Sequence, residues 1–196
     1  MWSEISDRLR RWSRGWVALV ALVIFGLFVA LALPAASSSA EAASEGAGSP
    51  DLSFFYSIDD LYRMAEAYGE AGRRAYIRQR FTFDLIWPLV YAAFLTTATG
   101  WVNGRTFSPD AAWQRANLAP LWGMLLDYAE NVATSLVMFR YPERSPVIGA
   151  FATLFTPLKW VFVGGSFVLL AVGIVVSVWR WATKRRASGA GRRPRR

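Results

Sequence analysis

The chain has 196 residues, of which 54% are hydrophobic and 18% are charged, and its apolar residues occur in long blocks that are unusual for a soluble domain of this size. It contains no cysteine and no histidine, which excludes thiol redox chemistry, the usual zinc sites, haem held by histidine and catalytic dyads built on imidazole. The net charge of +8 is concentrated at the two ends, so it indicates membrane topology before it indicates nucleic-acid binding.

The first predicted transmembrane helix covers residues 16–36 and follows a basic N-terminal segment, residues 1–15. Its apolar run has about the length that crosses a bilayer core, and Pro34 is expected to end it. A cleavable signal peptide within residues 1–40 is the alternative, because basic residues, an apolar run and the small residues PAASSSA occur in that order. The run is longer than a typical leader core, which favours a retained helix.

Residues 37–56 are expected to form a flexible linker, because the stretch SSSAEAASEGAGSP has no aromatic or β-branched residue. A single amphipathic helix is predicted over 57–80. Ser57 is its expected N-cap, with Asp60 three positions later and apolar residues at helical spacing after it. Its basic end, RRAYIRQR, favours a position at the lipid headgroups outside the cell, and a solvated helix that covers the end of the bundle is the alternative.

Three more apolar segments of membrane-spanning length follow. The predicted transmembrane helices cover residues 81–102, 118–139 and 148–181, joined by a cytoplasmic loop at 103–117 and an outer loop at 140–147, with a basic cytoplasmic tail at 182–196. The sequence therefore predicts an all-α, polytopic membrane helical bundle with four transmembrane helices and one amphipathic interfacial helix.

Basic residues favour the cytoplasmic side, so four spans place both ends of the chain inside the cell. The Arg-rich, Ala-rich and Gly-rich composition favours a bacterial plasma membrane. The basic termini are expected to contact anionic lipid headgroups rather than nucleic acid. Four arginines close to the second span, at positions 73, 74, 78 and 80, are expected outside the cell and are therefore exceptions to the cytoplasmic preference of basic residues.

Six polar residues lie in layers within the predicted spans, from Asp127 near the bilayer middle, through four residues about a turn further out, to Asp84 nearer the outer surface. An ionised side chain that faces lipid costs about 3 kcal/mol, so these residues are expected to face one another inside the bundle. The predicted polar cluster contains Asp84, Tyr91, Asp127, Glu130, Asn131 and Lys159.

Three acids and one base give this predicted cluster a surplus of negative charge, which protons, water, a metal, Arg80 or Arg140 would have to balance. At least one acid is expected to carry a proton. A magnesium site is disfavoured because Lys159 at the same depth would repel the ion, and no cofactor is predicted.

The favoured interpretation of the polar cluster is structural, because polar side chains hold helices together in lipid. A membrane enzyme acting on a lipid or isoprenoid headgroup is one alternative, with Asp84, Tyr91, Asp127, Glu130 and Lys159 as its catalytic candidates. A proton-coupled transporter is the other; because the chain has only four short spans, it would need to act as a homo-oligomer or with a membrane partner.

The stretches FDLIWPLVY and DYAEN resemble those of a set of small prokaryotic integral membrane proteins with an acid-Pro-Tyr span and a D-x-x-E-N span. The resemblance covers the two central predicted spans. It implies a four-helix membrane fold, and no assigned activity or catalytic residue comes with it.

Overall fold

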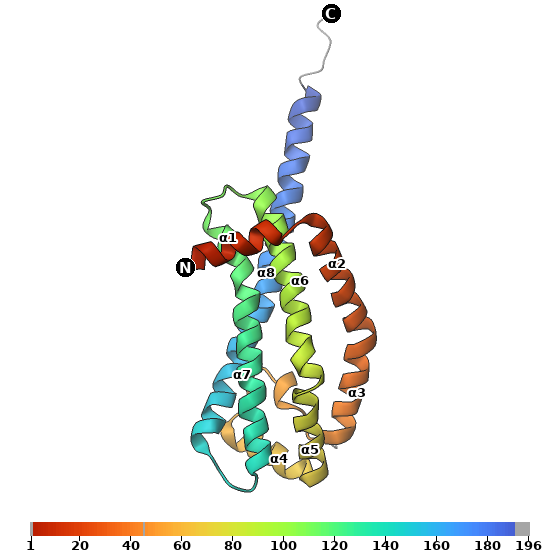
Figure 1. Cartoon of the computed structure of the whole chain (residues 1–196), viewed down its shortest axis with the longest axis vertical. Helices are drawn as coiled ribbons and strands as arrows, with labels where there is room; N and C mark the ends of the chain where they lie inside the picture. Colours follow the sequence, from red (N-terminus) through yellow and green to blue (C-terminus); the bar gives the residue numbers. More distant parts are fainter. Residues whose placement is uncertain (1, 45, 191–196) are drawn as a thin grey trace, which may run out of the picture.

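The computed structural model describes residues 2–44 and 46–190, and this part of the chain is helical with no β-strand (Figure 1). Long helices run side by side along the molecule, and shorter ones cover its two ends. In chain order the elements are α1 (Trp2–Trp12), α2 (Gly15–Leu27), a π-helical turn η1 (Phe28–Ala32), α3 (Leu33–Ser44), a 3₁₀ turn η2 (Pro50–Leu52), α4 (Ile58–Ala67), α5 (Gly69–Arg80), α6 (Phe83–Thr106), a 3₁₀ helix η3 (Ala112–Leu118), α7 (Ala119–Arg140) and α8 (Pro146–Ala190).

Within the described residues, three helical stretches are long and apolar enough to cross a membrane: Gly15–Ala42, Gly69–Thr106 and Pro146–Arg185. They agree with three of the four predicted spans and support a membrane protein. Helix α7, which coincides with the remaining predicted span, is not among them because its polar residues lower its hydropathy.

The first of these helical stretches differs from the prediction at its C-terminal end. The helix passes through Pro34 and ends at Ser44, so residues 37–44, expected as linker, are helical. Proline removes one helical N–H and crowds the preceding turn. The wider π-helical turn at Phe28–Ala32 lies directly before it, where this crowding must be accommodated. Beyond Pro34 the chain is rich in alanine, which is the strongest helix former.

The amphipathic segment also differs, because two helices replace the single predicted helix. The predicted cap at Ser57 is present: its hydroxyl accepts the backbone N–H of Asp60, and the Asp60 carboxylate accepts the N–H of Ser57. The break follows Tyr68, where Gly69 adopts a φ of +58°, a left-handed conformation that glycine tolerates best. Helices α4 and α5 pack on the end of the bundle, burying Leu61 and Tyr76 against Val137.

Helices also extend into the segments predicted to connect the spans or to follow the last one. Helix α6 extends to Thr106 and η3 forms at Ala112–Leu118, so much of the predicted loop 103–117 is helical. Helix α8 begins at Pro146 and includes residues 182–190 of the predicted tail. Residues 191–196 of that tail lie outside the described residues.

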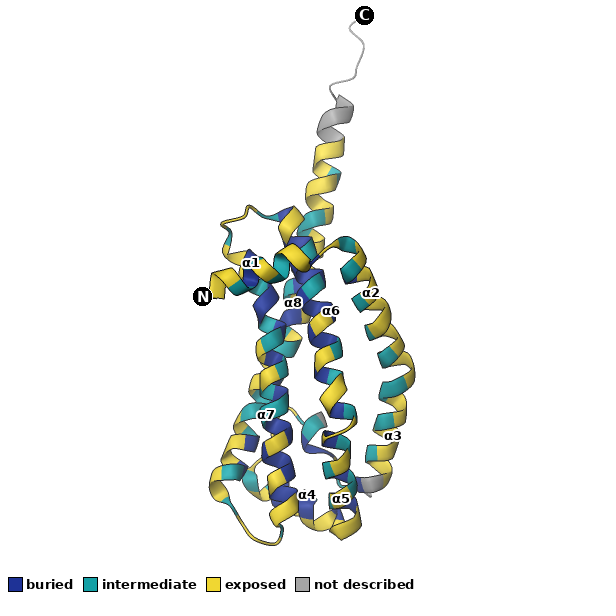
Figure 2. Cartoon of the chain, in the orientation of Figure 1, coloured by how far each residue is buried: buried dark blue, intermediate teal, exposed yellow. Residues whose placement is uncertain are grey.

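Burial in this fold is the reverse of that in a soluble protein (Figure 2). Helix α2 exposes Leu19, Val23 and Leu27, each about half accessible, whereas Glu130 and Lys159 in the middle of the bundle are only 1% and 3% exposed. Apolar side chains face outward to lipid and ionisable ones face inward where a chain crosses a bilayer. The burial pattern is therefore that of a membrane-embedded bundle.

Candidate functional site

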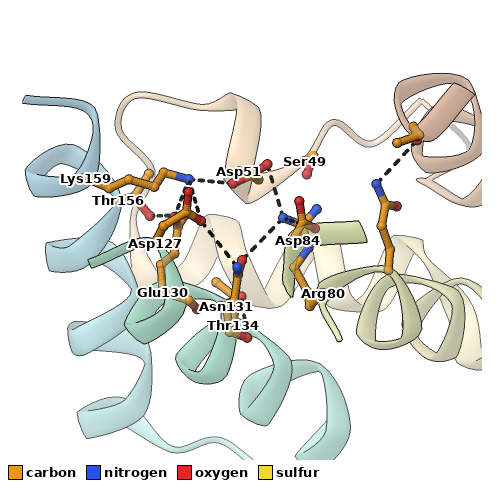
Figure 3. A network of polar contacts seen from close by, with 12 residues as sticks. Ser49, Asp51, Arg80, Asp84, Asp127, Glu130, Asn131, Thr134, Thr156 and Lys159 are labelled. Carbon is orange, nitrogen blue, oxygen red and sulfur yellow. Dashed lines mark hydrogen bonds and ion pairs between the residues drawn. The ribbon is translucent and has the colours of Figure 1, made fainter. Parts of the chain in front are cut away.

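Six ionisable side chains meet inside the lower half of the bundle and form what we call the ion cluster (Figure 3). They come from η2, the end of α5, the first turn of α6, the middle of α7 and the middle of α8. The members are Asp51, Arg80, Asp84, Asp127, Glu130 and Lys159.

One half of the ion cluster is organised by Lys159, a 3% exposed residue of α8. Its Nζ lies 2.5 Å from Glu130 Oε2 and 2.5 Å from Asp51 Oδ1, and 4.0 Å from Asp127 Oδ1. An ammonium group has three N–H donors, and here three carboxylates lie around it. We call the cluster members Lys159, Glu130 and Asp127, together with Tyr91, which is hydrogen-bonded to Asp127, the Lys159 half.

The other half is organised by Arg80, which is also 3% exposed. Its Nη1 lies 3.0 Å from Asp84 Oδ2 and 3.1 Å from Asp51 Oδ2, and it donates a 3.5 Å hydrogen bond to Asn131 Oδ1. Its guanidinium also stacks over the ring of Tyr76, 4.6 Å from the centroid. We call the cluster members Arg80 and Asp84, together with the hydrogen-bonded Asn131, the Arg80 half. Asp51 contacts both cations and so joins the two halves.

Hydroxyl and amide groups donate further hydrogen bonds to the acids on α7. Tyr91 Oη donates to Asp127 Oδ2 at 3.0 Å, and Asn131 Nδ2 donates to Asp127 Oδ1 at 3.3 Å. Thr156 Oγ1 donates to Glu130 Oε1 at 2.6 Å. The six residues of the predicted polar cluster are therefore brought together, and Asn131 is the link between Asp127 and Arg80.

Sequence reasoning missed Asp51, which it assigned to the linker. Small residues precede Asp51 and the apolar residues Leu52, Phe54 and Phe55 follow it, but no helical periodicity in this stretch marks Asp51 for burial. Burial alone would raise the pKa of Asp51, but the charges of Lys159 and Arg80 outweigh burial and hold that pKa below its usual range. The segment that carries Asp51 is thus fixed to the bundle by two ion pairs.

Sequence reasoning considered two arginines as balancing charges, and the structure separates them. Arg80 precedes Asp84 by four positions, a spacing that brings the two side chains onto one helical face. Arg140 pairs instead with Glu143 near the exposed end of α7, and its side chain is 47% accessible. It takes no part in balancing the ion cluster.

Three carboxylates of the ion cluster are close enough to hold a metal ion. One oxygen each from Asp51, Asp127 and Glu130 lies within 4.8 Å of the others. The Lys159 ammonium lies among the same three groups, 2.5–4.0 Å from them. These carboxylates therefore already share a cation, and a divalent ion beside it would be repelled.

A pocket of about 250 Å³ lies against the Lys159 half, between α3, α6 and α8. Polar groups line one end of this pocket: Asp51, Tyr91, Asp127 and Lys159. The rest of its wall is mainly apolar and aromatic: Leu33, Ser37, Trp87, Trp160, Val163 and Phe167. Ser37 and Phe167 are exposed, so the pocket opens on the side of the bundle between α3 and α8. Asp84, Glu130 and Asn131 do not line it.

No protein-family model, curated protein or solved structure matches this chain. Over the part of the chain that the structure describes, the fold and the site define an all-helical protein with three helices long and apolar enough to span a membrane and a buried ion cluster beside a lateral pocket. What this protein does is therefore inferred from the chemistry of that pocket.

Proposed function

We propose that the chain is a four-span integral membrane protein of a bacterial plasma membrane, with α7 as the fourth span and both ends cytoplasmic. Helix α7 lies alongside the other long helices (Figure 1). Its outward residues Leu125, Val132, Leu136 and Phe139 are all exposed and apolar, whereas its acids point inward. The basic helix α1 and the end of α8 lie at the same end of the molecule, as the positive-inside rule requires.

We infer that this protein binds an amphiphilic small molecule that enters from the bilayer, with its polar end at Lys159 and Asp127. The observation that carries this proposal is the pocket, which joins charged groups at one end to apolar walls and an opening between two lipid-facing helices. Binding sites for small molecules have this composition, with a few polar groups in a mainly apolar cleft.

The size of the pocket limits what it holds. At about 250 Å³ it is smaller than the roughly 300–1,000 Å³ typical of sites for drug-sized ligands. It therefore accommodates a polar head and the first part of an apolar tail, while the remainder of the tail lies in the bilayer beyond Ser37 and Phe167.

The Arg80 half keeps the structural role expected for the whole polar cluster. Asp84 and Asn131 contact Arg80 and do not line the pocket. Through Asp51, the same arginine fixes the segment that forms part of the pocket wall. The Arg80 half thus positions the site without touching its ligand.

Chemistry on a lipid headgroup is a second candidate function, favoured by one observation. Tyr91 and Asp127 form a hydrogen-bonded pair at the pocket, so a carboxylate and a hydroxyl are both available to a bound headgroup. In this function Asp127 acts as a general base on the bound headgroup and Tyr91 donates a proton to it.

Native mass spectrometry of the purified protein tests the binding proposal. We expect one amphiphile to remain bound after detergent washing, and Ser37→Trp to remove it by filling the opening. Ser38→Trp is the matched control, since Ser38 is exposed on the same helix and does not line the pocket. A wild-type protein without bound amphiphile, or equal retention by both variants, would overturn the proposal.

A further inference from the structure

We propose that the polar end of the ligand is a monovalent organic cation, an ammonium group attached to an apolar tail. This inference rests on the proposed function, because it names the chemical class that the pocket beside the Lys159 half accepts. It comes from the distribution of charge in the ion cluster and from the aromatic walls of the pocket.

The ion cluster contains more acids than bases. Four carboxyl groups face two cationic side chains, so two negative charges remain when every group is ionised. Charges buried in a region of low dielectric require a compensating charge or proton nearby. Balancing the ion cluster therefore requires two further positive charges, which protons or a bound cation can supply.

One-to-one pairing leaves two acids, Asp51 and Asp127, and Asp127 is the one farther from a cationic nitrogen. Asp84 pairs with Arg80, Glu130 pairs with Lys159, and Asp51 contacts both cations. The two oxygens of Asp127 accept hydrogen bonds from neutral groups, those of Tyr91 and Asn131. Within the described part of the chain, Asp127 forms an ion pair with Lys159, at the longer distance of 4.0 Å.

The position of Asp127 makes this charge available to a ligand. Asp127 and Asp51 both line the pocket, and Asp51 keeps 26% of its side chain accessible. An ammonium group at this end of the pocket would meet two carboxylates. Lys159 lies there as well, but Glu130 and Asp51 at 2.5 Å each offset its positive charge.

The walls of the pocket favour the same kind of ligand. Trp87, Trp160 and Phe167 line it, and aromatic faces attract ammonium groups through cation–π interactions, most strongly where water is excluded. The centroid of the Trp160 ring already lies 5.2 Å from the Lys159 Nζ. An anionic head would instead face the carboxylates of Asp51 and Asp127, and an alcohol would leave the surplus charge unbalanced.

Three probes of equal chain length test the inference on the full-length protein in lipid nanodiscs: octylammonium, octanol and octanoate. Isothermal titration calorimetry is expected to show octylammonium binding about ten-fold or more tightly than octanol, a difference of about 1.4 kcal/mol or more, and octanoate binding more weakly than both. Ser37→Trp should abolish octylammonium binding and Ser38→Trp should leave it unchanged.

Asp127→Asn assigns the preference to its carboxylate. This variant should lose about ten-fold in octylammonium affinity while its octanol affinity stays within about two-fold of wild type. The exposed Asp59→Asn is the matched control and should change neither. Because octanol affinity also reports a folded pocket, a misfolded variant is recognised by the loss of both.

The outcomes separate this inference from the proposed function. If octanol or octanoate binds as tightly as octylammonium and Ser37→Trp removes that binding, the pocket binds amphiphiles but the cationic head is wrong. If octylammonium binding is the same in wild type and Asp127→Asn, the inference is also overturned. If no probe distinguishes wild type from Ser37→Trp, both proposals fail.

Discussion

The Arg80 half and the Lys159 half contain the same kinds of side chain but differ in what lies beside them. In the Arg80 half, a guanidinium is held by Asp84, Asp51, Asn131 and the ring of Tyr76, and neither Asp84 nor Asn131 lines the lateral pocket. In the Lys159 half, a pocket of about 250 Å³ reaches Asp127, Tyr91 and Lys159. Similar charges can therefore hold a bundle together in one place and be available to a ligand in another.

The difference depends on how completely each acid is neutralised. Asp84 Oδ2 lies 3.0 Å from Arg80 Nη1, whereas Asp127 Oδ1 lies 4.0 Å from Lys159 Nζ. A buried pair of opposite charges is costly to break by removing one partner. Removing the charge of an acid whose hydrogen bonds come only from neutral groups should therefore lower the free energy of unfolding less.

Arg80→Met is expected to give the largest effect. It leaves Asp84 and one oxygen of Asp51 without their cation in a buried site, and removing one partner from a buried ion pair costs about 3–5 kcal/mol. The measurement is the free energy of unfolding in detergent with increasing denaturant. Arg78→Met, at an exposed position of the same helix, is the control and should change that free energy by less than about 0.5 kcal/mol. Equal effects of the two variants would refute a structural role for the Arg80 half.

Asp84→Asn and Asp127→Asn compare the two halves directly. Asp84→Asn removes a close partner of Arg80 and should lower the free energy of unfolding by about 2 kcal/mol. Asp127→Asn should lower it by less than about 1 kcal/mol, because an amide still accepts a neutral hydrogen bond and the ion cluster loses surplus negative charge. Ligand binding should show the opposite order, with the larger loss in Asp127→Asn. If Asp127→Asn is the more destabilising change, the two halves do not differ as proposed.

Asp51→Asn should lower the free energy of unfolding by about 1 kcal/mol at neutral pH, since Asp51 is 26% accessible and solvent screens its ion pairs. The charges of Lys159 and Arg80 hold the pKa of Asp51 below its ordinary value of 3.8. The carboxylate therefore stabilises the fold fully above pH 3.8, and this contribution is lost as the pH falls further. The stability difference between wild type and Asp51→Asn should be constant from pH 7 to about pH 5 and shrink below pH 3.8. A difference that grows on acidification would contradict this assignment.

The sequence by itself determined the helical membrane class and much of the membership of the polar cluster. Long apolar runs predict spans because only helices or closed barrels satisfy the backbone within lipid. The spacing of Asp127, Glu130 and Asn131 places them on one helical face, which a buried acid must turn toward protein. The cap at Ser57 was also predictable, since it depends on residues only three positions apart.

The tertiary structure alone decided how the ion cluster is divided. Asp51 reaches Lys159 from 108 positions away in the chain, and its local sequence carries no sign of that contact. The passage of the helix through Pro34 brings Leu33 and Ser37 to the pocket, whereas local rules end the helix there. Periodicity along one segment shows which face is buried, but the pairing of charges and the shape of a pocket depend on how distant segments pack. That packing therefore decides whether an acid is neutralised by a nearby cation or faces the pocket.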